Sequence, residues 1–380
     1  MTRQSAYSTW ASQGTEECSP RPRDGVPLHP GAERIRKTVS VMAKELNWGV
    51  LGTADIGLRA VLPAIRRAEG GKLVAVASRD IAKARAAADT LTIPVVHGSY
   101  EELLRDPSVD AVYIPLPNSL HVDWAVRAIE HGKHVLCEKP MATTTAGVDE
   151  IREAAARMGV LAEEAMMYRF HPQTELMLDM VRSGGLGDVH LVTASFTYGL
   201  GRQDDIRLRS ALGGGVMYDV GSYCVHVARK AFGAEPEAVF GWARVGPGSD
   251  VDEVFAGTMR FPNDRMATFV CSLRGPRAQS YTVTGTDASL TAPLPFAPGT
   301  EDRVLIVKRG WRREDVREER LVVNGTDQYQ VMIEDFNRRA RTDTPPETDL
   351  TDTRANLTAV CGLLESAKTG CMVPIPAQGE

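Results

Sequence analysis

The sequence lacks several patterns that would each assign it to a class of protein. No apolar run approaches the roughly 20 residues that a membrane-spanning helix needs, and positive charge is not in excess, because 44 Lys and Arg face 49 Asp and Glu. The six cysteines include no CxxC pair, and the histidines include no HExxH pair. We therefore expect a cytoplasmic protein with reduced thiols, no metal site, no membrane association and no nucleic-acid partner.

The first 44 residues differ in composition from the rest of the chain. Residues 1–40 are rich in Ser, Thr, Pro, Arg and Gly and show no apolar periodicity, which predicts that they form no packed core. A signal peptide needs a central apolar region, which this segment does not contain, and the acids at Glu16, Glu17, Asp24 and Glu33 are atypical of a transit peptide. We predict that residues 1–44 are a disordered extension, or that translation starts at Met42.

From residue 45 to about residue 166, short apolar segments alternate with amphipathic ones. The predicted strands are 48–51, 72–77, 111–114, 134–137 and one near Val160, and the predicted helices are 57–68, 80–90, 100–105, 120–131 and 143–158. Strands that alternate with helices of this length are typical of a parallel, doubly wound sheet. We therefore predict a dinucleotide-binding Rossmann domain over residues 45–166.

The pattern changes after about Tyr168, where apolar and polar residues alternate with a period of two. The predicted strands are 188–196, 238–245, 253–261, 265–273, 279–284 and 303–308, and the predicted helices are 172–183, 328–341 and 352–369. This predicts an α+β domain over residues 167–380, an open-faced, mostly antiparallel sheet with helices on one face. We expect the last helix to pack back on the Rossmann domain and the open face to form a homodimer or homotetramer.

A glycine-rich turn follows the first predicted strand. Gly52, Thr53, Ala54, Asp55, Ile56 and Gly57 form a GxGxxG pattern with alanine at the middle glycine. Such a turn brings the backbone amides of a helix N-terminus to a pyrophosphate. The alternative is a plain tight turn, but its place between a predicted strand and helix favours cofactor binding.

The end of the second predicted strand indicates which dinucleotide binds. An enzyme that uses NAD usually has an acid there for the ribose 2′-hydroxyl, whereas this strand ends in Ser78 and Arg79. Both side chains, with Lys83 one helical turn on, are suited to a 2′-phosphate. Asp80 is assigned only the role of helix N-cap. The pattern favours NADP, and NAD remains possible if Arg79 is simply a solvated surface residue.

Two further segments lie where the carboxyl edge of the sheet is expected. Pro115, Leu116, Asn118 and His121 follow the predicted strand 111–114 and are candidates for cofactor contacts, although Asn118 could instead cap a helix and His121 could be a surface residue. Glu138 and Lys139 directly follow the predicted strand 134–137, and Glu138 is a further candidate for a cofactor contact. A lysine at the end of a buried strand is costly unless it is paired or functional.

A glycine run at residues 213–215 leads into a second cluster of polar side chains. Asp219 and Tyr223 are four residues apart on a predicted helix and therefore share one face. We expect Lys139 to lower the pKa of the Tyr223 phenol, which would suit that phenol to proton transfer with a substrate oxygen. His226, one turn further on, is expected to support the site or simply to pack in the core.

The glycine turn, the Glu138-Lys139-Pro140 run, residues 168–172 and residues 213–223 together resemble the glucose–fructose oxidoreductase / inositol dehydrogenase (Gfo/Idh/MocA) family. The resemblance implies NAD(P) in the Rossmann domain and a sugar or cyclic polyol beside it. It also implies that Lys139 is catalytic or orients substrate, that Tyr168 and Arg169 lie near the nicotinamide, and that Asp219 contacts substrate. Tyr223 replaces the histidine of many members, as in dihydrodiol dehydrogenases, NADP-dependent xylose dehydrogenases and ketosugar reductases.

These observations predict an NADP-dependent oxidoreductase that exchanges a hydride with a sugar carbon, as an aldose 1-dehydrogenase does. Tyr223 and Lys139 are the predicted catalytic residues, and Lys139, Asp219 and Tyr223 the predicted substrate contacts. One alternative is a reductase of a nucleotide-linked 3-keto sugar, for which Arg202, Arg207 and Arg209 are candidate contacts. Another is an NADP-sensing regulatory protein, which the presence of both Lys139 and Tyr223 disfavours.

Overall fold

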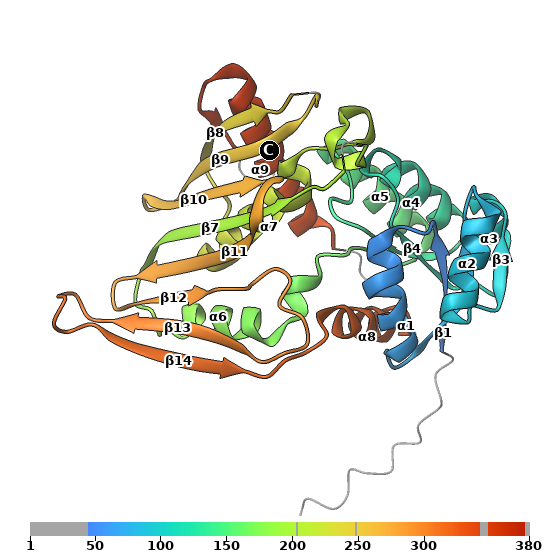
Figure 1. Ribbon diagram of the computed structural model, residues 1–380, viewed down its shortest axis with the longest axis horizontal. Coiled ribbons are helices and arrows are strands. Elements are labelled where there is room, and N and C mark those ends of the chain that lie inside the picture. Colours follow the sequence, from blue (N-terminus) through green and yellow to red (C-terminus); the bar gives the residue numbers. More distant parts are fainter. Residues whose placement is uncertain (1–44, 203, 248, 343–348, 377–380) are drawn as a thin grey trace, which may run out of the picture. The chain divides into compact units, whose positions relative to one another are not determined.

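The computed structural model describes residues 45–202, 204–247, 249–342 and 349–376 (Figure 1). The extension and the translation start predicted within residues 1–44 therefore lie outside the described residues. Two separate sheets organise the rest of the chain, one of six strands and one of nine strands.

The first sheet is parallel throughout and has the strand order β3-β2-β1-β4-β5-β6. Its strands are β1 (Leu46–Leu51), β2 (Gly71–Ala77), β3 (Val95–His97), β4 (Ala111–Ile114), β5 (His134–Cys137) and β6 (Ala162–Glu164). Strands buried on both faces read as continuous apolar runs, and all four residues of β4 are buried. This is the predicted doubly wound parallel sheet, whose order reverses between β1 and β4, where ligands bind in such folds.

Helices cover both faces of this sheet and connect its strands. They are α1 (Leu62–Arg67), which continues a π-helical turn at Gly57–Val61, α2 (Ile81–Leu91), α3 (Tyr100–Arg105), α4 (His121–Glu130) and α5 (Thr145–Met158). Asp80 caps α2, as predicted, and its side chain accepts hydrogen bonds from the backbone N–H groups of Ala82 and Lys83 at 3.0 and 3.4 Å. The cap satisfies amides that no carbonyl of the helix can reach.

Replacement of this cap gives a modest, measurable effect. Asp80→Ala is expected to lower the free energy of unfolding by about 1 kcal/mol, because the two amides lose their acceptor. Asp89→Ala, at an exposed position of the same helix, is the matched control and should leave the denaturation midpoint unchanged. Urea denaturation followed by circular dichroism makes the comparison, and equal losses for the two variants would contradict the capping role.

The second sheet has the order β14-β13-β12-β11-β7-β10-β9-β8-β15 and is antiparallel except between β7 and β10. Its strands are β7 (Val189–Gly199), β8 (Ala238–Val245), β9 (Asp252–Phe261), β10 (Arg265–Ser272), β11 (Arg274–Gly285), β12 (Ala288–Ala292), β13 (Arg303–Arg309), β14 (Arg317–Val323) and β15 (Val373–Pro374). The predicted mostly antiparallel sheet is thus confirmed. The alternation of buried and exposed residues along β9 and β10 places one face in the core.

Four more helices follow along the chain, α6 (Pro172–Arg182), α7 (Ser222–Phe232), α8 (Gln328–Ala340) and α9 (Thr351–Thr369). Of these, α7 packs on β7 and α9 packs on β8 of this sheet, whereas α8 packs on α1 of the first domain. On α8, Asn337 Oδ1 accepts a 2.9 Å hydrogen bond from Trp48 Nε1, and Phe336 packs on the Trp48 ring with centroids 5.0 Å apart. On α9, Arg354 pairs with Asp149 of α5 at 3.0 Å. These contacts hold α8 against β1 and α9 against α5 of the first domain.

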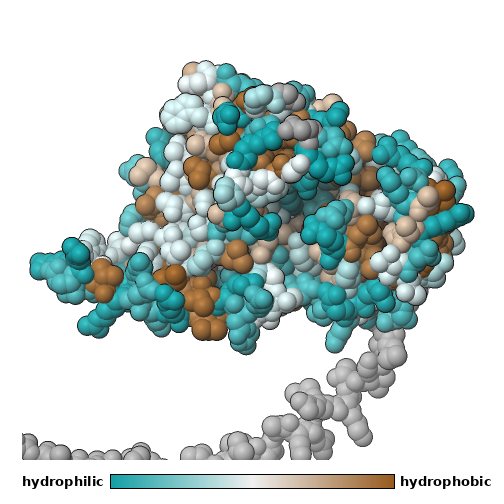
Figure 2. Space-filling model, viewed as in Figure 1, coloured by the Kyte–Doolittle hydropathy of each residue, from teal (hydrophilic) through white to brown (hydrophobic). Residues whose placement is uncertain are grey.

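The other face of the nine-stranded sheet carries exposed apolar side chains. Trp242 and Val270 both align with Ala256, so they lie in one row across three strands, and Met266 lies on the same face of β10 as Val270. Their exposed fractions are 68% for Trp242, 49% for Val270 and 58% for Met266. In Figure 2 the surface over the strands is mostly pale, with isolated brown side chains. In the part of the chain described here, no helix is long and apolar enough to cross a membrane.

Candidate active site

A cavity of about 920 Å³ opens between the two sheets. The parallel sheet contributes the turn after β1, the loop after β4 and the end of β5, and the second sheet contributes β7, β11 and the start of the α7 segment. The lining side chains belong to Ala54, Asp55, Ile56, Arg59, Ala60, Pro115, Leu116, Asn118, Glu138, Lys139, Met167, Phe196, Tyr198, Arg202, Asp205, Ile206, Arg207, Leu212, Asp219, Val220, Tyr223, Arg277, Phe296, Ala297 and Tyr329, with Gly213 to Gly215 beside them.

Lys139 lies at the centre of this lining and is held by the opposite domain. Its ammonium group donates to the backbone carbonyl of Asp219 and lies 3.2 Å from the Asp219 carboxylate. The same nitrogen lies 5.0 Å from the centroid of the Tyr223 ring, within the range of a cation–π contact. The structure therefore brings Lys139 together with Asp219 and Tyr223, which lie 80 or more residues further along the chain.

Asp219 joins three side chains. One oxygen accepts from Lys139 and lies 3.3 Å from Arg207 Nε, and the other accepts from the Tyr198 hydroxyl. Burial by itself raises the pKa of this carboxyl, but the charges of Lys139 and Arg207 and the hydrogen bond from Tyr198 outweigh it, so the pKa lies below its usual range. Asp219 is therefore ionised and fixes the position of the Lys139 ammonium.

Tyr223 is almost fully buried, with 3% of its surface exposed, and its hydroxyl contacts Met167 Sδ at 3.3 Å. The expectation that Lys139 lowers its pKa is wrong for this arrangement. Burial raises the pKa of the phenol well above its ordinary value, and the nearby acids Glu138, Asp219 and Glu164 raise it further. Lys139 contacts the face of the ring and donates its hydrogen bonds to Asp219. The phenol therefore stays protonated and can act as a proton donor.

The start of α7 is shaped for close approach to the cavity. Residues 217–221 form a π-helical turn that carries Asp219 just before Tyr223, and such turns are frequent at functional sites. Gly215 has φ +120° and leads into this turn, where a Cβ atom would lie 2.2 Å from Asp252 Oδ1. Only glycine fits there, because the conformation and the crowding both exclude a side chain.

Glu138 forms the floor of the cavity beside Lys139. It accepts a 2.7 Å hydrogen bond from the buried Tyr113 hydroxyl. Burial raises the pKa of Glu138, while the Tyr113 hydrogen bond and the Lys139 charge oppose that rise. Of these two neighbouring acids of the cavity, Asp219 is thus ionised, whereas the surroundings of Glu138 disfavour its charge.

The turn after β1 has the geometry that a dinucleotide requires. Gly52 has φ +110°, and a Cβ atom at this position would lie 3.1 Å from Leu116 Cδ2, so a larger residue would be both strained and crowded. Ala54, Asp55 and Ile56 line the cavity directly after it, at the start of the helical segment. These residues fit a pyrophosphate held by backbone amides at a helix N-terminus.

Comparison with known proteins agrees with this arrangement. The family model of the Gfo/Idh/MocA oxidoreductases with an NAD-binding Rossmann fold matches residues 46–165, and the model of the C-terminal domain of the same family matches residues 175–291. The chain belongs to the Gfo/Idh/MocA family. The predicted family and the predicted oxidoreductase class are therefore confirmed.

Relatives within the family act on different sugars. The chain is 38% identical to a D-xylose 1-dehydrogenase (NADP(+)) of Haloferax volcanii over 86% of its own length and 99% of the relative. It is 35% identical to a dTDP-3,4-didehydro-2,6-dideoxy-alpha-D-glucose 3-reductase of Streptomyces violaceoruber over 69% and 81% of the two chains. A 3-ketoreductase from Actinomadura kijaniata, solved with NADP and TDP-benzene, superposes with a TM-score of 0.80 at 29% identity, over 85% of this chain and 98% of that chain.

The residues predicted to select the cofactor lie at the carboxyl end of β2, beside the glycine turn. Ser78 is buried and its hydroxyl accepts from the backbone N–H of Asp80 at 3.2 Å, whereas Arg79 is exposed. Lys83 is also exposed and lies 3.9 Å from the Asp80 carboxylate. None of the three lines the cavity, so their contact with a 2′-phosphate stays a prediction.

Two residues of the loop after β4 take different places. Asn118 lines the cavity, and its side chain donates to the Gly213 carbonyl at 2.8 Å, which ties the loop to the second domain instead of capping α4. His121 is fully buried and does not line the cavity. Its two ring nitrogens lie 2.8 Å from the carbonyl oxygens of Pro140 and Leu116. His121 is thus a core residue that braces both cavity loops.

Tyr168 and Arg169 also lie outside the lining, which contains their neighbour Met167 instead. Tyr168 is fully buried behind Tyr223, and Arg169 is exposed. Of the arginines proposed for a nucleotide sugar, Arg202 and Arg207 line the cavity and Arg209 does not. Within the described ranges, no group of three or more His, Cys, Asp or Glu side chains is placed to hold a metal ion.

Several lining residues carried no signal in the sequence. Tyr198 lies at the end of β7, Arg277 lies in β11, Phe296 lies in a loop and Tyr329 lies on α8. The chain brings them to the cavity only through the pairing of distant strands and the return of α8.

Proposed function

We propose that this protein transfers a hydride between NADP(H) and a ring carbon of a sugar, with Tyr223 passing the accompanying proton. The observation that supports this most is the Lys139–Asp219–Tyr223 cluster, which faces a cavity that also contains the glycine turn. A bound nicotinamide would supply the hydride exchange. The chain supplies an acid, a fixed cation and polar side chains for the sugar hydroxyls.

Each residue of the cluster has a separate task in this proposal. The Tyr223 phenol is protonated and gives its proton to a carbonyl oxygen during reduction, or receives one from a hydroxyl during oxidation. Lys139 stabilises negative charge that develops on that oxygen. Asp219 holds the ammonium in place and, with Tyr198 and Arg207, presents polar groups to neighbouring hydroxyls. The apolar side chains of Met167 and Phe296 exclude water around the phenol.

NADP is the proposed cofactor because of Ser78 and Arg79 at the end of β2, and because the relatives named above are an NADP(+) xylose dehydrogenase and a 3-ketoreductase solved with NADP. Arg79→Ala is expected to raise the KM for NADPH about tenfold and to leave the KM for NADH unchanged, since only NADPH carries the 2′-phosphate. Steady-state kinetics with both cofactors make the measurement. Arg85→Ala, at an exposed position of α2, is the control, and a parallel rise with NADH would contradict the assignment.

A nucleotide-linked keto sugar is the second candidate substrate, and Arg277 is the observation that favours it. Arg202 and Arg207 line the cavity, but both have ion-pair partners. Arg202 pairs with Asp204, and Arg207 pairs with Asp205 and Asp219. Arg277 also lines the cavity, and among the described residues its guanidinium has no hydrogen bond or ion pair. An unpaired guanidinium suits a phosphate group.

One panel of assays distinguishes the two proposed substrate classes from each other and from a cofactor-sensing protein. Turnover would be measured with NADP and either aldoses or trans-dihydrodiols. It would also be measured with NADPH and either free or nucleotide-linked keto sugars. Turnover of free aldoses supports the leading proposal, and turnover restricted to nucleotide-linked keto sugars supports the second. Tight NADPH binding without any turnover would instead indicate a cofactor-sensing protein and would overturn both.

We also propose that the nine-stranded sheet forms a homodimer or homotetramer. The row of Trp242, Ala256 and Val270, with Met266 beside it, offers apolar surface on strands whose other face is in the core. Sedimentation velocity of wild type and of Trp242→Glu with Val270→Glu tests this. A monomeric wild type, or a double variant with unchanged mass, would contradict it.

A further inference from the structure

Behind Tyr223 lies a buried chain of three hydrogen-bonded side chains from three separate segments. The Tyr168 hydroxyl, in the 3-10 turn Met167–Phe170, lies 2.5 Å from Nδ1 of His226 on α7. Nε2 of the same histidine lies 3.0 Å from Oδ2 of Asp352, in the first turn of α9. Tyr168 is fully buried and His226 is 2% exposed. None of the three lines the active-site cavity.

The charges around this chain fix where its protons lie. Burial alone would raise the pKa of Asp352, but the hydrogen bond from His226 and the charges of Arg229 and Lys230 hold it well below its usual range. Burial, together with the charges of Arg169 and Arg229, lowers the pKa of His226 to about 4 against the opposing effect of Asp352. Burial also keeps the Tyr168 phenol protonated. At neutral pH the chain is therefore an anion, a neutral imidazole and a neutral phenol.

Only one arrangement of hydrogens satisfies these states. An ionised carboxylate can only accept, so His226 must donate from Nε2 to Asp352. A neutral imidazole has one N–H, so Nδ1 is an acceptor and the Tyr168 hydroxyl donates to it. The direction of both hydrogen bonds is thus set by Asp352.

The Tyr168 ring is in direct contact with the proposed proton donor. It meets the Tyr223 ring edge-on at 5.7 Å and the Phe296 ring edge-on at 5.4 Å, an arrangement that aromatic pairs prefer. His226 lies one helical turn beyond Tyr223 on the same helix. The chain therefore holds both the ring behind Tyr223 and the helix that carries it.

We propose that Asp352, His226 and Tyr168 are positioning residues that set the orientation of the Tyr223 phenol in the cavity. The inference rests on the proposed function of Tyr223. Asp352 aligns the imidazole, the imidazole aligns the Tyr168 hydroxyl, and the Tyr168 ring confines Tyr223. If one of these hydrogen bonds is lost, the proton donor is misplaced and kcat falls, while cofactor binding is unaffected.

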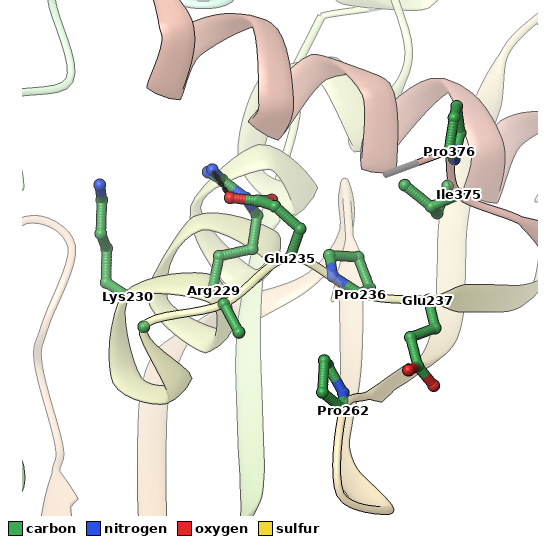
Figure 3. Close-up of a pocket in the computed structure, with 10 residues that line it drawn as sticks. Arg229, Lys230, Glu235, Pro236, Glu237, Pro262, Ile375 and Pro376 are labelled. Carbon is green, nitrogen blue, oxygen red and sulfur yellow. Dashed lines mark hydrogen bonds and ion pairs between the residues drawn. The ribbon is translucent and has the colours of Figure 1, made fainter. Parts of the chain in front are cut away.

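The outer end of the chain lies beside a second hollow, of about 670 Å³, that shares no lining residue with the active site. Arg229 and Lys230 line it, and both pair with Asp352 Oδ1, at 2.9 and 2.8 Å. Figure 3 shows the Arg229 guanidinium beside the Glu235 carboxylate, which binds it at 2.5 Å. These ion pairs fix Asp352 from the solvent side.

Tyr168→Phe is the decisive variant, because it removes one hydroxyl and keeps the ring. We expect kcat to fall about tenfold, the lower end of the loss seen when the hydrogen-bond partner behind a metal ligand is removed, with the KM for NADPH unchanged. Tyr281→Phe is the matched control. Tyr281 is equally buried and also packs on Phe296, but its hydroxyl has no hydrogen-bond partner within the described part of the chain. That control should keep wild-type kcat.

A second measurement does not depend on activity. In ¹⁵N-histidine-labelled full-length protein, His226, assigned with His226→Gln, should show the Nε2–H tautomer and should not titrate between pH 5 and 8. Asp352→Asn should change that tautomer. Equal kcat in Tyr168→Phe and Tyr281→Phe, an Nδ1–H tautomer in wild type, or titration in this range would overturn the inference. Full activity of Tyr223→Phe would overturn the proposed function instead, and the tautomer would still report on the chain.

Discussion

Tyr223→Phe is expected to lower kcat for sugar turnover by about 10² to 10⁴, the usual contribution of a positioned acid or base, while the Kd for NADPH changes little. The substitution removes only the hydroxyl, which contacts Met167 Sδ at 3.3 Å. The ring keeps its packing against Tyr168 and Phe296. Single-turnover kinetics and NADPH titration by fluorescence measure the two quantities.

Tyr218→Phe is the control for this loss. Tyr218 belongs to the same π-helical turn as Asp219, does not line the cavity, and donates to the Thr143 carbonyl at 3.2 Å. It should retain most of the wild-type kcat. If Tyr223→Phe lost NADPH affinity and kcat to the same degree, the phenol would be a binding residue and its role in proton transfer would be rejected.

Lys139→Met is expected to lower kcat by about 10² or more, with a smaller effect on NADPH binding. The substitution keeps a chain of similar length but removes the cation that would face the reacting oxygen. It also removes the largest of the influences that lower the pKa of Asp219, so the pKa of that carboxyl should rise. The kcat of the variant should therefore fall further as the pH is lowered and Asp219 takes up a proton.

The pH profile of kcat for Lys139→Met and wild type tests both parts of this prediction. Lys308→Met, which removes an exposed ammonium on β13 far along the second sheet, controls for the loss of one positive charge. A Lys139→Met enzyme with near wild-type kcat would show that Asp219 and Tyr223 suffice without the lysine.

Much of the fold was predictable because local patterns and topology agree. The alternation of apolar strands and helices from residue 45 gave the parallel sheet, and the period of two after Tyr168 gave the antiparallel one. Of the four strands that were not predicted, β3, β12, β14 and β15, two have a physical explanation. β3 has three half-buried residues, and β14 begins with four exposed, charged residues, so neither shows the apolar periodicity of a core strand. Their pairing with neighbouring strands stabilises them instead.

The candidate site was predictable where backbone motifs carry it. Gly52, Lys139, Asp219 and Tyr223 were identified from a turn, a strand end and a helix spacing, and the structure brings the last three into contact. The role expected of Lys139 towards the Tyr223 phenol was wrong. A sequence does not show how deeply a phenol is buried or that the Lys139 ammonium already donates to Asp219. Those two facts decide the direction of the pKa shift of Tyr223.

The sequence by itself thus determined the family, the two kinds of sheet and the residues with reactive groups, because these depend on patterns within short segments. Tertiary structure alone decided which of those groups meet. Asp219 reaches Lys139 across 80 residues, and Asp352 reaches His226 across 126. Burial at these meeting points sets the charge of each side chain, because the energy of a charge depends on its surroundings and not on its position in the chain.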